Sequence, residues 1–240
     1  SMVSNAEIEE LADGLIKKYL ASRKRVSTQI DIEEFCTKFL KLQITYADFA
    51  EDDMDKIGFL SDGITPLKIR NDSGKPIRAL YPEKTIVIEK HLLNQSQITR
   101  RRFTIAHEGS HHIFNLHCLR PVKACFNTVY DKEATYTLEQ FRQRFSLPES
   151  QSDRMAACLL MPRFLVTERL NRENNGSKIK LYGESILRPQ DKLLVQKLAD
   201  SFGASFSAFF IRLREMKLFE ECELSEYIER ELMPESGRPL

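Results

Sequence analysis

The stretch His107-Glu108-Gly109-Ser110-His111 constrains this chain more than any other part of its sequence. Side chains four residues apart lie on one face of an α-helix, so the imidazoles of His107 and His111 can bind the same metal ion. Glu108 is rotated by about a hundred degrees from His107, and its carboxylate can take a proton from a water molecule on that metal. The pattern therefore predicts a helix that carries a metal centre.

Two imidazoles and one carboxylate suit zinc, with a fourth position open for water. We therefore expect zinc as the cofactor, although the residues do not distinguish zinc from manganese. The third ligand has two candidates. One is His117, at the spacing of the pattern H-E-x-x-H-x-x-G-x-x-H. That pattern needs a glycine for a sharp turn, and this chain has Phe114 there, which favours a continuing helix.

The other candidate is Glu149, near the start of a second predicted helix. Pro148 and Pro162 bracket that helix, which has about three turns. Glu149 and Asp153 share one face of it, so Glu149 can bind the metal while Asp153 accepts the free N–H of a ligand histidine. Alternatively, Ser146 and Glu149 form a capping box, a common start of helices without any metal. The residues alone leave both interpretations of Glu149 open.

The rest of the chain predicts an α+β fold that is mostly helical. The spacing of apolar residues predicts helices over 6–22 and 31–40. Short apolar runs separated by turn residues predict a small antiparallel sheet, and a helical pattern returns from residue 96. The polar stretch 171–191 is expected to be a long surface loop. The basic triplet 100–102 is interpreted as a solvated face.

We expect a single domain over residues 1–220, followed by a charged tail over 221–240. The expected parts of the domain are N-terminal helices (6–43), the small sheet (44–92), the active-site helices (96–162) and a C-terminal helical hairpin (190–220). Gly203 is the expected turn of the hairpin. Phe206, Phe209 and Phe210 make its second helix apolar, which favours closing a core over binding DNA.

Composition excludes several classes of function. The 36 Lys and Arg residues balance 35 Asp and Glu residues, so nothing calls for a nucleic-acid or anionic membrane partner. The apolar runs are too short to cross a bilayer. The five cysteines are scattered and odd in number, and the N-terminus lacks the pattern of a secretory signal, so we expect a reducing cytoplasmic location.

Arg102-Phe103-Thr104-Ile105-Ala106-His107-Glu108 with His111, followed by Ala156-Ala157-Cys158-Leu159-Leu160-Met161-Pro162, resembles the ImmA/IrrE family of metallo-endopeptidases. The resemblance covers roughly residues 6–219. It implies a zincin-like fold and places the third metal ligand of the family on Glu149, with Asp153 in register. Departures are Ser152 in place of Ala, Met155 in place of Phe, and Gly109-Ser110 where Leu-Gly is common. The link between the two motifs is also longer than usual.

The resemblance implies a cytoplasmic zinc endopeptidase that cleaves helix-turn-helix repressors, often encoded with them on mobile elements. Glu108 would deprotonate the metal-bound water and return the proton to the leaving amine. Tyr130 and Tyr136 are both candidates for stabilising the oxyanion. The alternative function is a metal-stabilised regulatory or interaction protein that binds a repressor or DNA without proteolysis.

Overall fold

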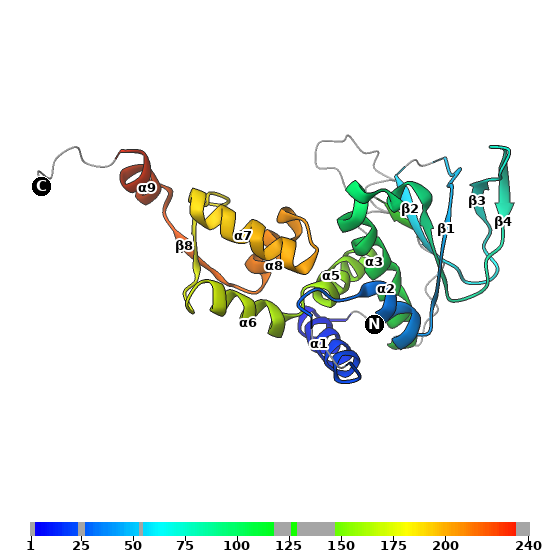
Figure 1. Cartoon of the computed structure of the whole chain (residues 1–240), viewed down its shortest axis with the longest axis horizontal. Coiled ribbons are helices and arrows are strands. Elements are labelled where there is room, and N and C mark those ends of the chain that lie inside the picture. Colours follow the sequence, from blue (N-terminus) through cyan, green and yellow to red (C-terminus); the bar gives the residue numbers. More distant parts are fainter. Residues whose placement is uncertain (1–2, 24–26, 53–54, 118–125, 129–146, 234–240) are drawn as a thin grey trace, which may run out of the picture. The chain divides into compact units, whose positions relative to one another are not determined.

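The computed structural model describes residues 3–23, 27–52, 55–117, 126–128 and 147–233. The chain divides into two compact units, Ser1–Pro162 and Arg163–Leu240. Figure 1 shows the helices and strands of both units. The fold is α+β and mostly helical, as the sequence predicts. The single domain expected over residues 1–220 stays a prediction.

Unit 1 begins with helix α1 (Asn5–Ala21), which matches the helix predicted over 6–22. Its start is fixed by a capping box: the Ser4 hydroxyl accepts a hydrogen bond from the Glu7 amide, and the Glu7 carboxylate accepts one from the Ser4 amide at 2.7 Å. Such reciprocal bonds satisfy two amide groups that otherwise lack a partner at a helix start. The side chains of Ile8 and Ile16 are fully buried on the inner face of α1.

The helix predicted over 31–40 consists of a short α-helix, α2 (Ile32–Glu34), that widens into a π-helical turn, η1 (Phe35–Phe39). The Leu40 amide donates to the Phe35 carbonyl, one residue further back than in an α-helix. The turn ends at Phe39, and Lys41, two residues later, has a positive φ of 61°.

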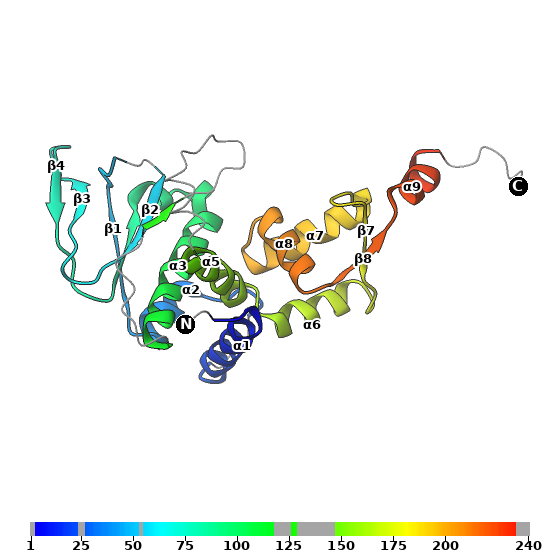
Figure 2. The ribbon, with the colours of Figure 1, turned by 180° about the vertical axis from the view of Figure 1, so that it is seen from behind.

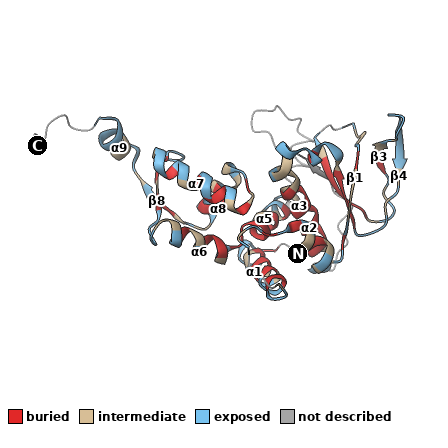
Figure 3. Ribbon diagram, viewed as in Figure 1, coloured by how far each residue is buried: buried red, intermediate tan, exposed pale blue. Residues whose placement is uncertain are grey.

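The long helix α3 (Ile98–His117) packs against α5 (Leu147–Leu160), and α5 also packs against α1. Residues 104–114 of α3 are all buried, so this helix lies in the interior of the unit (Figure 3). The polar residues before α3 form the 3-10 turn η3 (Gln95–Gln97). It follows another 3-10 turn, η2 (Lys90–Leu93).

The predicted solvated face at 100–102 is wrong for Arg102, which is buried. Its guanidinium donates a hydrogen bond of 2.9 Å to the Ile30 carbonyl. The guanidinium carries its N–H donors at the end of a long side chain, so it can reach a main-chain oxygen of another segment. Arg102 therefore ties α3 to the segment before α2.

The main sheet has the strand order β1 (Gln43–Ala47), β5 (Thr85–Glu89), β2 (Lys56–Leu60) and β6 (Phe126–Thr128). β5 is antiparallel to β2 but parallel to β1, so the sheet is mixed rather than wholly antiparallel as expected. The reason is that β5 lies between the two earlier strands instead of beside its neighbour in the sequence. Turn residues predict pairing between neighbours only.

The turn signals do identify the hairpin of β3 (Leu67–Arg70) and β4 (Pro76–Ala79). In its turn, the Asn71 side chain accepts from the Ser73 and Lys75 amides, and Gly74 has a φ of 76°. The two views of the ribbon show this hairpin on one side of the sheet and α1, α3 and α5 on the other (Figures 1 and 2). A small apolar core forms between hairpin and sheet from Ala47, Phe59, Leu67 and Val87.

Unit 2 contains α6 (Arg163–Glu173), α7 (Pro189–Phe202) and α8 (Phe206–Glu215). Gly203, with a φ of 63°, ends α7 in the left-handed conformation, which glycine adopts without strain. The Ser205 hydroxyl then caps α8. Phe209 is buried and its ring stacks on Phe202 at a centroid distance of 5.5 Å. The turn at Gly203 and the start of the second helix after Ser205 are thus confirmed.

The stretch 171–191 is not entirely a loop, because it contains β7 (Ile179–Tyr182), paired in parallel with β8 (Phe219–Cys222). The partner strand lies far away in the sequence, so the local polar composition hides it. The charged segment from residue 221 continues into α9 (Leu224–Tyr227) and the π-helical turn η4 (Ile228–Leu232). Within the described ranges, none of the helices combines the length and the apolar character that crossing a membrane requires.

Candidate metal centre

The structure brings together the three side chains predicted to bind metal. His107 and His111 lie one turn apart on α3, and their Nε2 atoms are 3.0 Å apart. Glu149, in the first turn of α5, places Oε2 at 3.1 Å from Nε2 of His107 and Oε1 at 3.5 Å from Nε2 of His111. Both imidazoles are almost fully buried, whereas the Glu149 side chain is 15% exposed. Of the three side chains, Glu149 is therefore the one with the most exposed surface.

These side chains fit a divalent metal ion. Ligand bonds of about 2.0–2.1 Å place two ligand atoms of a tetrahedral zinc site roughly 3.3 Å apart. The observed spacings between the three groups, 3.0 to 3.5 Å, bracket that value. All three ligand atoms lie within 4.8 Å of one another. Two imidazoles and a carboxylate are also a donor set that zinc prefers.

Helix α5 also supplies a partner for the outer nitrogen of each imidazole. Oδ1 of Asp153 lies 2.8 Å from Nδ1 of His107, as the sequence predicts. Oγ of Ser152 lies 3.2 Å from Nδ1 of His111, a contact that sequence reasoning missed. The sequence does carry a signal for this contact, because Ser152 stands at a helix position where the ImmA/IrrE family usually has alanine.

The charges in the centre shift the pKa values of its members. Burial acts to lower the pKa of His107, but hydrogen bonds to Asp153 and Glu149 outweigh it and raise that pKa to about 10. Burial acts to raise the pKa of Glu149, but its hydrogen bonds to both imidazoles more than offset this and hold it well below its usual range. Burial, followed by the nearby charge of His107, lowers the pKa of His111 despite the hydrogen bond to Glu149. The directions of these shifts favour a protonated His107 paired with an ionised Glu149.

Glu108 is fully buried and lies against the sheet, beside Gly58 of β2. A Cβ atom at position 58 would lie 2.7 Å from Oε1 of Glu108 and 2.7 Å from the methyl group of Thr104, closer than carbon and oxygen can approach without displacement. The space for the Glu108 carboxylate thus depends on the missing side chain at Gly58. A glycine inside an otherwise apolar strand is a signal of such close approach, which sequence reasoning did not use.

His117, the other candidate ligand, does not join the three side chains. His117 is the last residue of α3 and is exposed. The helix continues through Phe114, as expected for a bulky residue at that position, and does not turn back towards the metal ligands. The metal-binding group found among the described residues contains Glu149 and not His117. Ser146, Tyr130 and Tyr136 lie outside the described residues.

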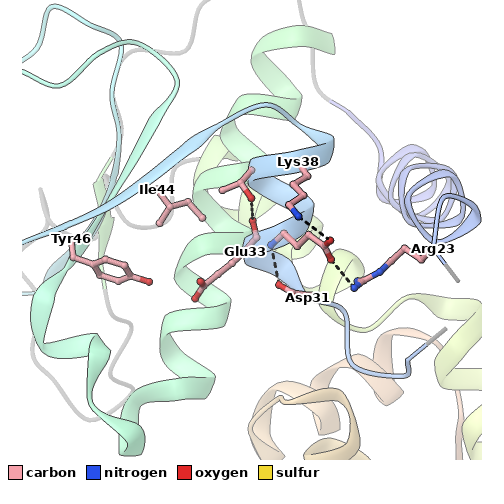
Figure 4. A pocket seen from close by; sticks show the side chains of 8 residues that line it. Arg23, Asp31, Glu33, Lys38, Ile44 and Tyr46 are labelled. Atoms are coloured by element: carbon pink, nitrogen blue, oxygen red, sulfur yellow. Dashed lines mark hydrogen bonds and ion pairs between the residues drawn. The ribbon is translucent and has the colours of Figure 1, made fainter. Parts of the chain in front are cut away.

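A separate hollow of about 540 Å³ opens between the π-helical turn and β1 (Figure 4). Its charged side chains bind one another: Glu34 forms ion pairs with Arg23 at 2.7 Å and with Lys38 at 3.9 Å. Asp31 accepts a hydrogen bond from the Glu34 amide at the start of α2. These contacts stabilise the helix start, and we assign no ligand to this hollow.

A buried helix with the H-E-x-x-H pattern, a sheet along one side and a glutamate from helix α5 together define a metallopeptidase-type centre. The family model for Peptidase M78, described as the IrrE N-terminal-like domain, matches residues 40–214. The chain therefore belongs to this family of metallopeptidases, and the match extends over parts of both units. No curated protein sequence matches the chain.

Proposed function

We propose that this protein is a zinc-dependent endopeptidase that hydrolyses a peptide bond in a helix-turn-helix transcriptional repressor. The observation that carries the hydrolytic part is the convergence of His107, His111 and Glu149. The buried carboxylate of Glu108 follows His107 in the chain, and its charge acts to raise the pKa of that imidazole. The repressor as substrate is supported by the family resemblance and not by the geometry of the site.

In this proposal His107, His111 and Glu149 hold the metal ion. When bound, the ion polarises the peptide carbonyl and lowers the pKa of a water molecule. Glu108 takes a proton from the attacking water as the new C–O bond forms. It then gives that proton to the leaving amine nitrogen as the C–N bond breaks. A buried carboxylate is suited to this exchange because its low-polarity surroundings strengthen its interaction with a nearby proton.

The surroundings keep these groups in place. Asp153 holds the His107 ring through Nδ1, so that Nε2 faces the centre. Gly58 leaves the room that the Glu108 carboxylate occupies. We place the protein in the cytoplasm. The support for this is that three cysteines among the described residues are free, namely Cys36, Cys158 and Cys222. Free cysteines are typical of a reducing compartment.

The test is to incubate the purified protein and zinc with a helix-turn-helix repressor encoded beside it, and to identify fragments by mass spectrometry. We expect cleavage that stops on adding a chelator and returns with zinc. Glu108→Gln is the matched control, because it should retain the metal and lose turnover. Wild-type turnover by Glu108→Gln would refute the role of Glu108. An intact repressor in a stable complex would instead favour a metal-stabilised protein that binds without cutting.

A further inference from the structure

The two imidazoles of the centre have the same orientation relative to Glu149. Their Nε2 atoms face each other and Glu149, so their Nδ1 atoms face outward. At His107 the outward atom meets the carboxylate of Asp153. At His111 it meets the hydroxyl of Ser152, a residue with no exposed surface.

We propose that Ser152 is a positioning residue that accepts a hydrogen bond from Nδ1–H of His111 and so keeps the lone pair of Nε2 directed at the metal. This deepens the proposed function and rests on it. A neutral imidazole carries its proton on one nitrogen only, and a hydrogen-bond acceptor at Nδ1 keeps the proton there. Because α5 carries Glu149, Ser152 and Asp153, one helix supplies a ligand and both outer partners.

The two outer partners differ in charge. The Asp153 side chain is 57% exposed, so water shields its carboxylate. Ser152 and His111 lie in the interior, where a second unpaired charge would be costly. A hydroxyl orients the ring without adding negative charge to a centre that already contains Glu108 and Glu149. Without the hydroxyl, the buried Nδ1–H would lose the partner that the structure provides, which favours other ring orientations.

The test is the zinc affinity of the full-length protein, measured by competition with a chromophoric chelator and without any substrate. We expect Ser152→Ala to weaken zinc binding about ten-fold, the lower end of what outer partners of ligand histidines contribute. The matched control is Ser150→Ala, an exposed position on the same helix, which should leave zinc affinity unchanged. Ser152→Thr keeps a hydroxyl and should recover most of the affinity.

A second readout is the Nδ1 proton of His111 in the zinc-loaded protein. By NMR, we expect it to exchange slowly with water in the wild type and rapidly in Ser152→Ala. The proposal is overturned if Ser152→Ala binds zinc as tightly as the wild type, or if Ser152→Thr loses as much affinity as Ser152→Ala. A wild type that binds zinc but cleaves no repressor would refute the proposed substrate and leave the role of Ser152 standing. A wild type that does not bind zinc would refute both.

Discussion

Oδ1 of Asp153 lies 2.8 Å from Nδ1 of His107. Glu149 precedes Asp153 by one helical turn, and its Oε2 lies 3.1 Å from Nε2, the other nitrogen of the same ring. The His107 imidazole is therefore held on both sides by carboxylates from one helix. The two carboxylates fix the orientation of the ring before any metal binds. The geometry of the metal centre therefore depends on how α5 packs on α3.

Asp153→Asn should weaken zinc binding by about ten-fold or more, because an amide can still contact Nδ1 but no longer supplies a negative charge. Turnover at saturating zinc should fall as well. Chelator competition measures the affinity, and Asp72→Asn, in the exposed turn between β3 and β4, is the control that should change nothing. Wild-type zinc affinity in Asp153→Asn would contradict the role assigned to this carboxylate.

Gly58→Ala should keep zinc but lower kcat by about a hundred-fold, the cost of displacing a catalytic group by about 1 Å. The reason is the 2.7 Å approach of a new Cβ to Oε1 of Glu108. Gly14→Ala, in a helix and with nothing within 4 Å of its Cβ position, is the control and should stabilise the protein by about 0.4–1 kcal/mol.

A double-mutant cycle separates the two contacts of the new methyl group. Combining Gly58→Ala with Thr104→Ser removes the contact with the Thr104 methyl group. The melting temperature should then rise towards that of the wild type, while kcat stays low. Recovery of full kcat in this pair would show that Thr104, and not Glu108, is the group that Gly58 accommodates.

Zinc binding at pH 7 should release about one proton, because the ligand nitrogen must lose its proton before it binds metal. The pKa of His107 is raised to about 10, so this ring is protonated at pH 7 in the metal-free protein. The pKa of His111 is lowered, so that ring is already neutral. Zinc affinity should therefore rise as the pH rises from 7 to 9. Calorimetry in buffers of different ionisation enthalpy counts the protons, and a count of zero would contradict this assignment.

Glu149→Ala should lose more zinc affinity than any change at an outer partner, that is, more than about a hundred-fold. His117→Ala should retain full affinity, since its side chain is exposed and does not belong to the group of three ligands. Metal analysis of the two purified variants provides the comparison. Zinc retained by Glu149→Ala and lost by His117→Ala would reverse the choice between the two candidate third ligands.

The features that sequence predicted well depend on short-range patterns. The helical spacing around His107 and His111 fixes α3 locally, and Pro148 in the first turn of α5 with Pro162 after its end does the same for α5. The hairpin turn at Gly74 follows from its own residues. The prediction that Glu149 and Asp153 lie near the histidines rested on two arguments. The two carboxylates share one face of a helix, and the family resemblance places the third ligand on Glu149. Their roles in metal binding and catalysis stay predictions until the variants are measured.

The features that sequence missed depend on contacts between distant segments. β5 lies between β1 and β2, and β7 pairs with a strand beyond α8, so neither arrangement is visible in a local window. The buried position of Arg102 depends on the carbonyl of Ile30. Ser152 acquires its partner only when α5 meets α3.

The ligands of the centre come from two helices separated by a long stretch of chain, with His111 on the first and Glu149 on the second. An ion shared between them is a cross-link that closes this loop, so its affinity contributes directly to the free energy of folding. Metal supply and the amount of properly folded protein are then linked. Scarcity of the ion would loosen the second helix as well as stop catalysis.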